Sequence, residues 1–226
     1  MSSYTVGLDL GQGQDFSALV VVERVLVLPP LVSVGAFWRA PQLVGPSIRE
    51  ERHVRHLRRW ELGTPYPVIV DDVATMMRSE AMRDGLLFID RTGVGRAVFD
   101  MFRDAWESEE FGASPPLGVT ITAGSRRNGM HVPKSDLLAA IQVPLQQGML
   151  RVADGLALGP VLERELVSFR QKISESGRDS FDVQRRAGEG HGDLVTALSL
   201  ALFQDNTISR PEVVENTDAL KGASND

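Results

Sequence analysis

The chain has 226 residues, 42% of them hydrophobic, with 24 basic against 30 acidic residues and a formal net charge of −6. Its length suits one α/β domain with a full core, and its apolar content excludes an intrinsically disordered protein. No apolar run approaches the ~20 residues needed to cross a membrane. The absence of cysteine excludes a disulfide framework and a zinc–thiolate site.

The negative charge is unevenly distributed along the chain. Residues 205–226 hold five acids against Arg210 and Lys221 and carry −3 of the −6. We expect residues 1–204 to form one domain and residues 205–226 to form a polar, acidic, disordered tail. An acidic balance alone disfavours a nucleic-acid partner, although a carboxylate cluster would account for the mildly acidic body. The N-terminus has no signal-peptide pattern, so we expect a cytoplasmic location and no membrane partner.

The first elements are predicted to be strands. Residues 4–10 ("YTVGLDL") and 17–25 ("SALVVVERV") are rich in Val and Leu and are joined by a Gly-rich hexapeptide. This pattern predicts a β-hairpin whose second strand is buried on both faces. Residues 31–39 follow the turn signal Pro29-Pro30 and predict a third strand, which gives an antiparallel meander.

The next two segments are predicted to be helices. Segment 47–62 has Ser47 as a potential N-cap, Glu50 three residues later and apolar residues at roughly helical spacing. One face of this expected helix carries Arg49, Arg52, Arg55 and Arg59. That face could contact DNA or a partner subunit, although a plain solvent-exposed face is the better interpretation. Segment 65–79 fits a strand or a helix, and its early prolines favour the helix.

The remaining chain alternates between strand and helix patterns, which predicts an α/β fold. The expected elements are a strand over 85–90, a helix over 91–106, a strand over 117–124, a helix over 133–148, a short strand over 149–154, a helix over 159–173, a strand over 179–185 and a helix over 192–204. Pro144 should kink its helix. The last helix is almost wholly apolar, so we expect it to be buried.

Three acids occupy comparable positions in this predicted order. Asp9 ends the first strand, Asp90 ends strand 85–90, and Asp193 stands at the head of the last helix. Strand ends and helix starts are where open α/β sheets place their sites. Three converging carboxylates repel one another without a cation, whereas Mg²⁺ or Mn²⁺ prefers such oxygen ligands. Two such ions about 4 Å apart can activate water and stabilise the leaving oxygen of a phosphodiester.

Each acid also has a simple structural interpretation. An aspartate beside glycines in a hairpin, like Asp9, is usually a turn residue. Asp90 and Asp193 could each cap the helix that follows. The order of the three acids on the strand–helix pattern is what favours a shared site over these separate roles.

This order of elements resembles the ribonuclease H-like superfamily, and three motifs resemble a family within it. They are "GLDLGQGQDFSALVVVE" (7–23), "LLFIDRTGVGRAVFD" (86–100) and "GHGDLVTALSLALF" (190–203). They look like the nuclease domain of the large terminase subunit of tailed bacteriophages. The resemblance runs from about residue 4 to residue 204, and its most specific part is the acid followed by Arg-Thr-Gly-Val-Gly. Segment 132–152 also resembles the family's basic residue, helix and strand before the final motif.

The resemblance implies an α/β fold with a mixed sheet, an antiparallel three-strand meander plus parallel strands, flanked by helices. It implies that Asp9, Asp90 and Asp193 are catalytic and hold two Mg²⁺ or Mn²⁺ ions. The implied activity is metal-dependent endonucleolytic cleavage of double-stranded DNA with low sequence specificity, in phage genome packaging. The implied partners are DNA and a packaging ATPase, a portal or a small terminase subunit, in the bacterial host cytoplasm.

The sequence departs from the family pattern in two respects. The family often has two adjacent acids after the late histidine, where this chain reads His191-Gly192-Asp193. Terminases also couple the nuclease to an ATPase, but no GxxxxGK[ST] phosphate loop occurs here. We therefore expect an excised domain, a stand-alone nuclease subunit or a phage-derived relative with another use, and no translocation activity of its own.

Other residues are secondary candidates for the site. Asp15 could join the metal site or orient a ligand water, and a turn role is at least as plausible. His191 could act on a leaving group, although a loop histidine is the more common case. Residues that could contact the DNA backbone are Lys134, Arg126, Arg127, Arg185 and Arg186. For the first three, a solvated loop explains the charges equally well.

Three other functions compete with the terminase-type nuclease. A junction resolvase of the same fold would need a dimer and a basic surface, which the net charge does not favour. A nucleotide-dependent actin-like or sugar-kinase-like module has a first phosphate motif resembling residues 8–20, but 226 residues are too few for its two domains. A non-catalytic assembly module that keeps the fold is the third alternative.

Overall fold

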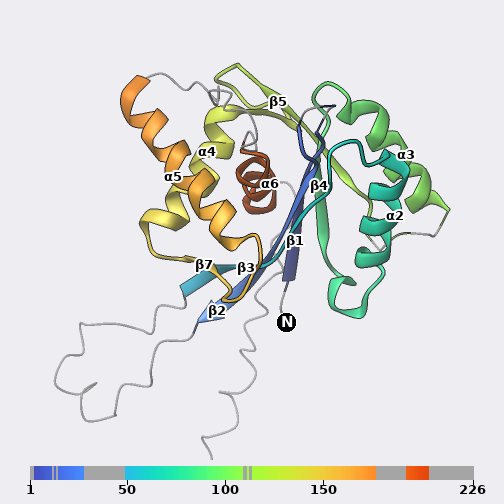
Figure 1. Cartoon of the computed structure of the whole chain (residues 1–226), viewed down its shortest axis with the longest axis horizontal. Helices are drawn as coiled ribbons and strands as arrows, with labels where there is room; N and C mark the ends of the chain where they lie inside the picture. The colour runs from blue at the N-terminus through green and yellow to red at the C-terminus, as the bar shows by residue number, and fades with distance from the viewer. Residues whose placement is uncertain are drawn as a thin grey trace, which may run out of the picture.

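The computed structural model describes residues 3–11, 13, 15–27, 49–108, 111, 114–176 and 192–203. Its middle layer is one mixed β-sheet, and helices cover both faces of the sheet (Figure 1). The strands are β1 (Ser3–Asp9), β2 (Ala18–Val27), β3 (Arg49–Arg59), β4 (Leu86–Asp90), β5 (Leu117–Thr122), β6 (His131–Pro133) and β7 (Leu150–Val152). The helices are α2 (Tyr66–Met77), the short 3₁₀ helix η1 (Glu80–Met82), α3 (Gly95–Glu107), α4 (Lys134–Gln146), α5 (Gly159–Ser176) and α6 (Asp193–Leu202).

The described strands form a seven-stranded sheet in the order β6-β5-β4-β1-β2-β3-β7. Strand β2 runs antiparallel to both of its neighbours, and the other neighbouring strands pair in parallel. The carboxyl ends of β1, β4 and β5 therefore lie at one edge of the sheet. This arrangement confirms the expected α/β class and the mixed sheet that combines an antiparallel meander with parallel strands.

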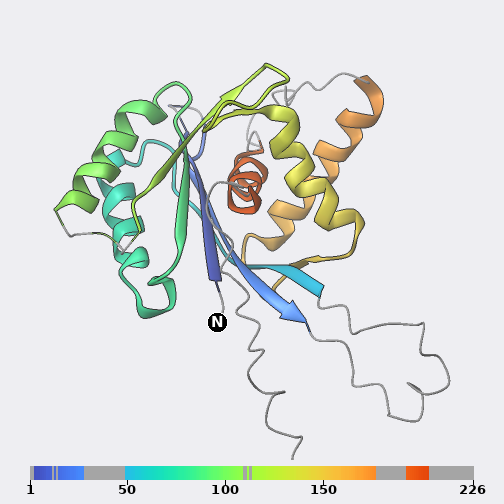
Figure 2. The same cartoon turned by 180° about the vertical axis from the view of Figure 1, so that it is seen from behind.

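The two faces of the sheet are covered by different helices. Helices α2 and α3 lie on one face, and α4, α5 and α6 lie on the other (Figures 1 and 2). Helix α6 packs directly on β1 and β2 and is buried along its length, as its apolar sequence predicts. A Cβ on Gly7 of β1 would lie 1.9 Å from the carbonyl oxygen of Ala197 in α6. Glycine at this position therefore permits the close approach of α6 to the sheet.

The prediction of a helix over segment 47–62 is wrong, because its described residues, 49–62, contain the strand β3. Strand β3 pairs with β2 on one side and β7 on the other. Val21 pairs with His56 and Val22 pairs with Val54, so Arg55 is an extra residue that forms a β-bulge. The bulge puts Val54 and Leu57 on the same buried face although they are three positions apart. Their helix-like spacing therefore arises within a strand.

The other predicted elements in the described residues have the expected type. Segment 65–79 forms α2, and the predicted strands and helices between residues 85 and 173 appear as β4, α3, β5, α4, β7 and α5. The predicted strands over 31–39 and 179–185 and the tail over 205–226 lie outside the described residues. The third strand of the meander is thus β3, and the three-residue β6 was not predicted. Among the described helices, none is long and apolar enough to cross a membrane.

Candidate active site

Two strand ends place Asp9 and Asp90 near one another. Asp9 is the last residue of β1, Asp90 is the last residue of β4, and the parallel register pairs Leu8 with Ile89. Leu8 and Ile89 belong to the core beneath α2 and α3. Because side chains alternate along a strand, Asp9 and Asp90 face the opposite side, where α6 packs. Both carboxylates thus lie on the α6 face at the same sheet edge.

Helix α6 brings Asp193 to this edge. Asp193 is its first residue and is 4% exposed. The preceding Gly192 has a φ of +84°, a left-handed conformation that strains residues with a Cβ. Asp193 is close enough for its charge to raise the pKa of Asp9. The fold therefore brings together the three acids that the sequence singled out.

Asp9 lies at the centre of this group of negative charges. Its pKa is raised well above the ordinary value, first by burial and then by the charges of Asp90, Asp193, Asp15 and Glu165. Such a carboxylate is destabilised when it is ionised and no cation is near. The group therefore has the electrostatic character of a cation site.

Asp90 is held by the turn that follows β4. The backbone N–H of Thr92 donates a hydrogen bond of 2.7 Å to Oδ1 of Asp90. Burial raises the pKa of Asp90, while Thr92 and the positive charge of Lys134 oppose that rise. Lys134 begins α4 directly after β6, and β6 runs parallel to β5, so this lysine lies at the same edge of the sheet. Asp90 does not cap the following helix, as its simpler interpretation expected, because the N-cap position of α3 is Val94.

Glu165 of α5 is a further acid of the site, and the sequence analysis missed it. Its Oε2 accepts hydrogen bonds from the backbone N–H groups of Leu194 (3.1 Å) and Val195 (3.2 Å) in the first turn of α6. Its Oε1 accepts a hydrogen bond from Arg59, the last residue of β3. Burial raises the pKa of Glu165, and the contacts with Arg59 and α6 oppose the rise.

A signal for Glu165 was present in the sequence. It lies one position before Leu166 and three after the fully buried Leu162, so it interrupts the apolar stripe of α5 with a charge. A charged residue on the buried face of a helix is rare unless it is paired. That pattern alone could have identified Glu165 as a buried, paired acid, but it could not have identified its partners.

Some of the described residues between β1 and β2 lie close to these acids. The N–H of Gly11 donates to Oγ of Ser17 (3.1 Å), and the hydroxyl of Tyr66 in α2 donates to the carbonyl of Gly11 (2.9 Å). Asp15 is exposed in this loop, but its charge still contributes to the raised pKa of Asp9. The structure thus places Asp15 beside the acids, where both roles considered for it remain open.

The basic candidates are distributed differently. Arg126 is exposed in the segment after β5, which leaves the sheet at the edge where Asp90 lies. The guanidinium carbon of Arg127 lies 4.6 Å from the ring centroid of Phe203, and its Nε donates to the carbonyl of Gly129. Arg185, Arg186 and His191 lie outside the described residues.

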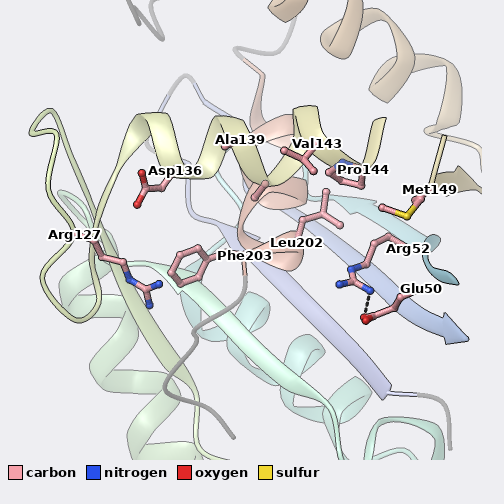
Figure 3. Close-up of a pocket in the computed structure, with 11 residues that line it drawn as sticks. Glu50, Arg52, Arg127, Asp136, Ala139, Val143, Pro144, Met149, Leu202 and Phe203 are labelled. Carbon is pink, nitrogen blue, oxygen red and sulfur yellow. Dashed lines mark hydrogen bonds and ion pairs between the residues drawn. The ribbon is translucent and has the colours of Figure 1, made fainter. Parts of the chain in front are cut away.

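A cavity of about 410 Å³ lies between α4, the end of α6, the strand β3 and Met149, which precedes β7 (Figure 3). Its lining includes Val143, Pro144 and Leu202, and charged side chains such as Arg52 and Arg127 lie at its border. Asp9, Asp90 and Asp193 are not among its lining residues. This cavity is therefore separate from the acidic group.

The acidic group fits a divalent cation by charge and by donor type. All its acidic members offer carboxylate oxygens, the ligands that hard cations such as Mg²⁺ and Mn²⁺ prefer. Among the described residues, no three His, Cys, Asp or Glu side chains converge as closely as a metal site requires. To hold an ion, the carboxylates of Asp9, Asp90 and Asp193 would therefore have to lie closer together than they do here.

Comparisons with known proteins give one structural likeness. No family model matches the sequence, and no curated protein matches it. The structure is similar to the large terminase nuclease from thermophilic phage G20c, with a TM-score of 0.47 and 18% sequence identity, over 88% of this chain and 81% of that chain. Proteins with related folds need not share an activity, so function has to be argued from the site itself.

Proposed function

We propose that this protein is a divalent-metal-dependent endonuclease that cleaves double-stranded DNA with low sequence specificity. The observation that carries the proposal is that Asp9, Asp90 and Asp193 lie at one sheet edge, where burial and then the charges of the other acids raise the pKa of Asp9. Grouped carboxylates that destabilise one another in the absence of a cation are the expected ligands of Mg²⁺ or Mn²⁺.

Two ions bound to these carboxylates would activate a water and stabilise the leaving oxygen of a phosphodiester. The chain's own residues would have distinct tasks. Asp9, whose pKa is raised by the charges of both other acids, would hold the ions together with Asp90 and Asp193. Lys134, close enough to Asp90 to affect its pKa, is suited to orient a phosphate. Asp15 would orient a ligand water from the loop.

The proposal extends to a biological role through the sequence motifs. Residues 7–23, 86–100 and 190–203 resemble the terminase nuclease domain, and these 226 residues contain no GxxxxGK[ST] phosphate loop. We therefore infer that the chain cuts DNA during phage genome packaging, while a packaging ATPase supplies translocation. A portal or a small terminase subunit would be a further partner.

The test is cleavage of supercoiled plasmid DNA with Mn²⁺ or Mg²⁺. The wild-type protein should nick or linearise the plasmid, and EDTA should abolish cleavage. Asp90→Ala and Asp193→Ala should each lower the rate by at least about 100-fold, because replacing even an outer partner of a metal ligand typically costs 10- to 100-fold. Asp100→Ala, an exposed aspartate of α3, is the matched control and should keep wild-type activity.

The outcomes separate the candidate functions. Full activity of the Asp90 and Asp193 variants would refute the three-acid site. A wild-type protein that neither binds Mn²⁺ nor cuts DNA would favour the non-catalytic assembly module. Selective cleavage of four-way junctions over linear duplex would instead favour a junction resolvase.

A further inference from the structure

Arg91 directly follows Asp90, and its side chain lies on the opposite face of the sheet. Its Cδ takes up the space that a side chain on Gly118 of β5 would need, since a Cβ there would lie only 1.9 Å away. The guanidinium carbon of Arg91 lies 4.7 Å from the ring centroid of Phe99 in α3. Its backbone N–H donates a 2.7 Å hydrogen bond to the carbonyl of Val119. Arg91 is therefore held on the α3 face, whereas Asp90 faces α6.

The guanidinium of Arg91 has no anionic partner in the part of the chain that the structure describes. No acid there forms an ion pair with it, and its Nε is buried and donates no hydrogen bond. A cation that is partly removed from water without an anion beside it lowers stability. The residue is only partly buried, so its terminal nitrogens can still meet a ligand from solvent. An apolar side chain would fill the same space, so packing alone does not explain the charge.

Arg96 is a second cation in this region. It lies three positions before Phe99 in α3, so the two side chains are neighbours on the helix surface. Arg96 is exposed and has no ion pair with any described acid, since Asp100, four positions on, pairs with Arg103 (3.6 Å). The first turn of α3 contains no acid, and the helix dipole disfavours a cation there. Arg91 and Arg96 are thus two positive charges beside Phe99 that no described acid neutralises.

The two faces of this sheet edge therefore carry separate cations. Lys134 is close enough to Asp90 to lower its pKa from the α4 side, and Arg91 and Arg96 lie on the α3 side (Figures 1 and 2). Duplex DNA carries one negative charge per about 1.7 Å of helix axis, so a duplex held at Asp90 presents further phosphates on both sides. The guanidinium group matches the geometry of a phosphate, to which it can donate two parallel hydrogen bonds.

We propose that Arg91 and Arg96 bind the DNA backbone on the α3 face, so that the duplex lies across the sheet edge from Lys134 to α3. The inference rests on the proposed function, because it takes duplex DNA as the substrate. It does not depend on how the acids of the site would hold a metal ion. Contacts to phosphates position a duplex without reading its sequence, which agrees with the low sequence specificity proposed above.

The test is duplex binding, measured by fluorescence anisotropy as a function of salt concentration. Every protein carries Asp193→Ala, which prevents cleavage under the proposed function, so Mn²⁺ can stay present. Arg91→Met and Arg96→Met should each make the slope of log Kobs against log salt shallower by about 0.9, and the double variant by about 1.8. Arg83→Met is the matched control, since Arg83 is exposed before the amino end of β4, at the opposite edge of the sheet. It should leave the slope unchanged.

Two further measurements separate DNA binding from a structural role of Arg91. Methionine keeps an apolar stem over Gly118 and against Phe99 while it removes the charge, so Arg91→Met should unfold at a temperature no lower than its parent. Arg91→Lys keeps the positive charge and should restore the salt slope. A structural role predicts instead a lower Tm for Arg91→Met and a salt slope that is the same in all three proteins.

The outcomes distinguish this inference from the proposed function. An unchanged slope in Arg91→Met or in Arg96→Met, in a protein that binds duplex DNA, would overturn the proposed path of the duplex and leave the nuclease proposal standing. A parent protein and a wild type that bind no duplex, with or without Mn²⁺, would overturn the proposed function and this inference with it.

Discussion

At the scale of single residues, the acids of the candidate site lower the stability of the folded protein. Asp9 is enclosed with Asp90, Asp193 and other acids, and burial and repulsion both disfavour its ionised form. A group whose folded-state pKa is raised lowers stability at neutral pH, where it must ionise in the folded protein. Such a position is expected where function and not folding selects the residue.

The first prediction follows for Asp9→Asn. In EDTA this variant should unfold at a higher temperature than the wild type, because it removes a partly buried negative charge that the neighbouring acids repel. A ligand at a hundredfold excess over its Kd adds about 2.7 kcal/mol, so Mn²⁺ should raise the wild-type Tm by roughly 5–10 °C. The variant should lose most of this increase. Differential scanning calorimetry with and without Mn²⁺ measures both effects.

Asp84→Asn provides the control, since Asp84 is exposed in the turn before β4. It should leave both the Tm in EDTA and the Mn²⁺ response unchanged. An Asp9→Asn protein that is less stable than the wild type in EDTA would mean that the Asp9 carboxylate stabilises the fold, contrary to the electrostatic argument.

The residues of the site differ in how far the sequence could predict them. Asp9, Asp90 and Asp193 stand at strand ends or a helix start, which are local features visible in the sequence. The spacing of α5 could mark Glu165 as a buried acid, but the contacts of Glu165 and Arg59 could not be assigned from the sequence, because they depend on the packing of α5 and β3 against α6. Contacts between elements more than 100 positions apart, such as Arg59 with Glu165, leave no local pattern.

At the scale of elements, β3 shows how a bulge can imitate a helix. Its sequence "REERHVRHLRR" is highly charged, and its buried residues Val54 and Leu57 are three positions apart. A regular strand would put these two side chains on opposite faces, so the pattern favoured a helix. The charges are accommodated by ion pairs with neighbouring elements, such as Arg55 with Glu23 and Arg58 with Asp72. Neither the bulge nor these partners is encoded by local spacing.

The second prediction concerns the contact between α6 and β1. Gly7→Ala would place a Cβ 1.9 Å from the carbonyl oxygen of Ala197 and 2.6 Å from the backbone nitrogen of Ala201. Since both neighbours are backbone atoms of a buried helix, neither can move alone. We expect a loss of unfolding free energy at the upper end of the overpacking range, about 3 kcal/mol. Denaturant unfolding followed by circular dichroism measures this loss.

Gly159→Ala is the matched control for this change. A Cβ at Gly159 would meet only the Cβ of Leu156, at an ordinary 3.7 Å. This substitution at the start of α5 should be neutral or slightly stabilising, because alanine favours a helix over glycine. Equal stability of Gly7→Ala and the wild type would show that α6 lies farther from the sheet than described.

At the scale of the whole molecule, the net charge of −6 does not show how acidic and basic residues are distributed around the candidate site. The acids of the candidate site lie on one face of the sheet edge, and Lys134 and Arg126 come from segments that meet the same edge. For a nuclease this arrangement is favourable, because basic residues at the border attract the DNA backbone towards a site that repels it when no cation is bound.

The last prediction therefore tests Arg126 as a phosphate contact. In an Asp90→Ala background, which prevents cleavage, Arg126→Ala should weaken duplex binding similarly for unrelated sequences. The slope of log Kobs against log salt should become shallower by about 0.9, the value for one phosphate contact.

Arg78→Ala is the control. Arg78 follows the last residue of the 12-residue helix α2, and Tyr66 at the other end of α2 contacts Gly11. Because of the length of α2, Arg78 lies roughly 18 Å from the segment at the site. Replacing Arg78 should therefore leave the slope unchanged. Fluorescence anisotropy between about 50 and 200 mM salt, a range over which phosphate contacts lower the affinity strongly, measures both slopes. Equal slopes for the two variants would remove Arg126 from the DNA-binding surface without affecting the metal site.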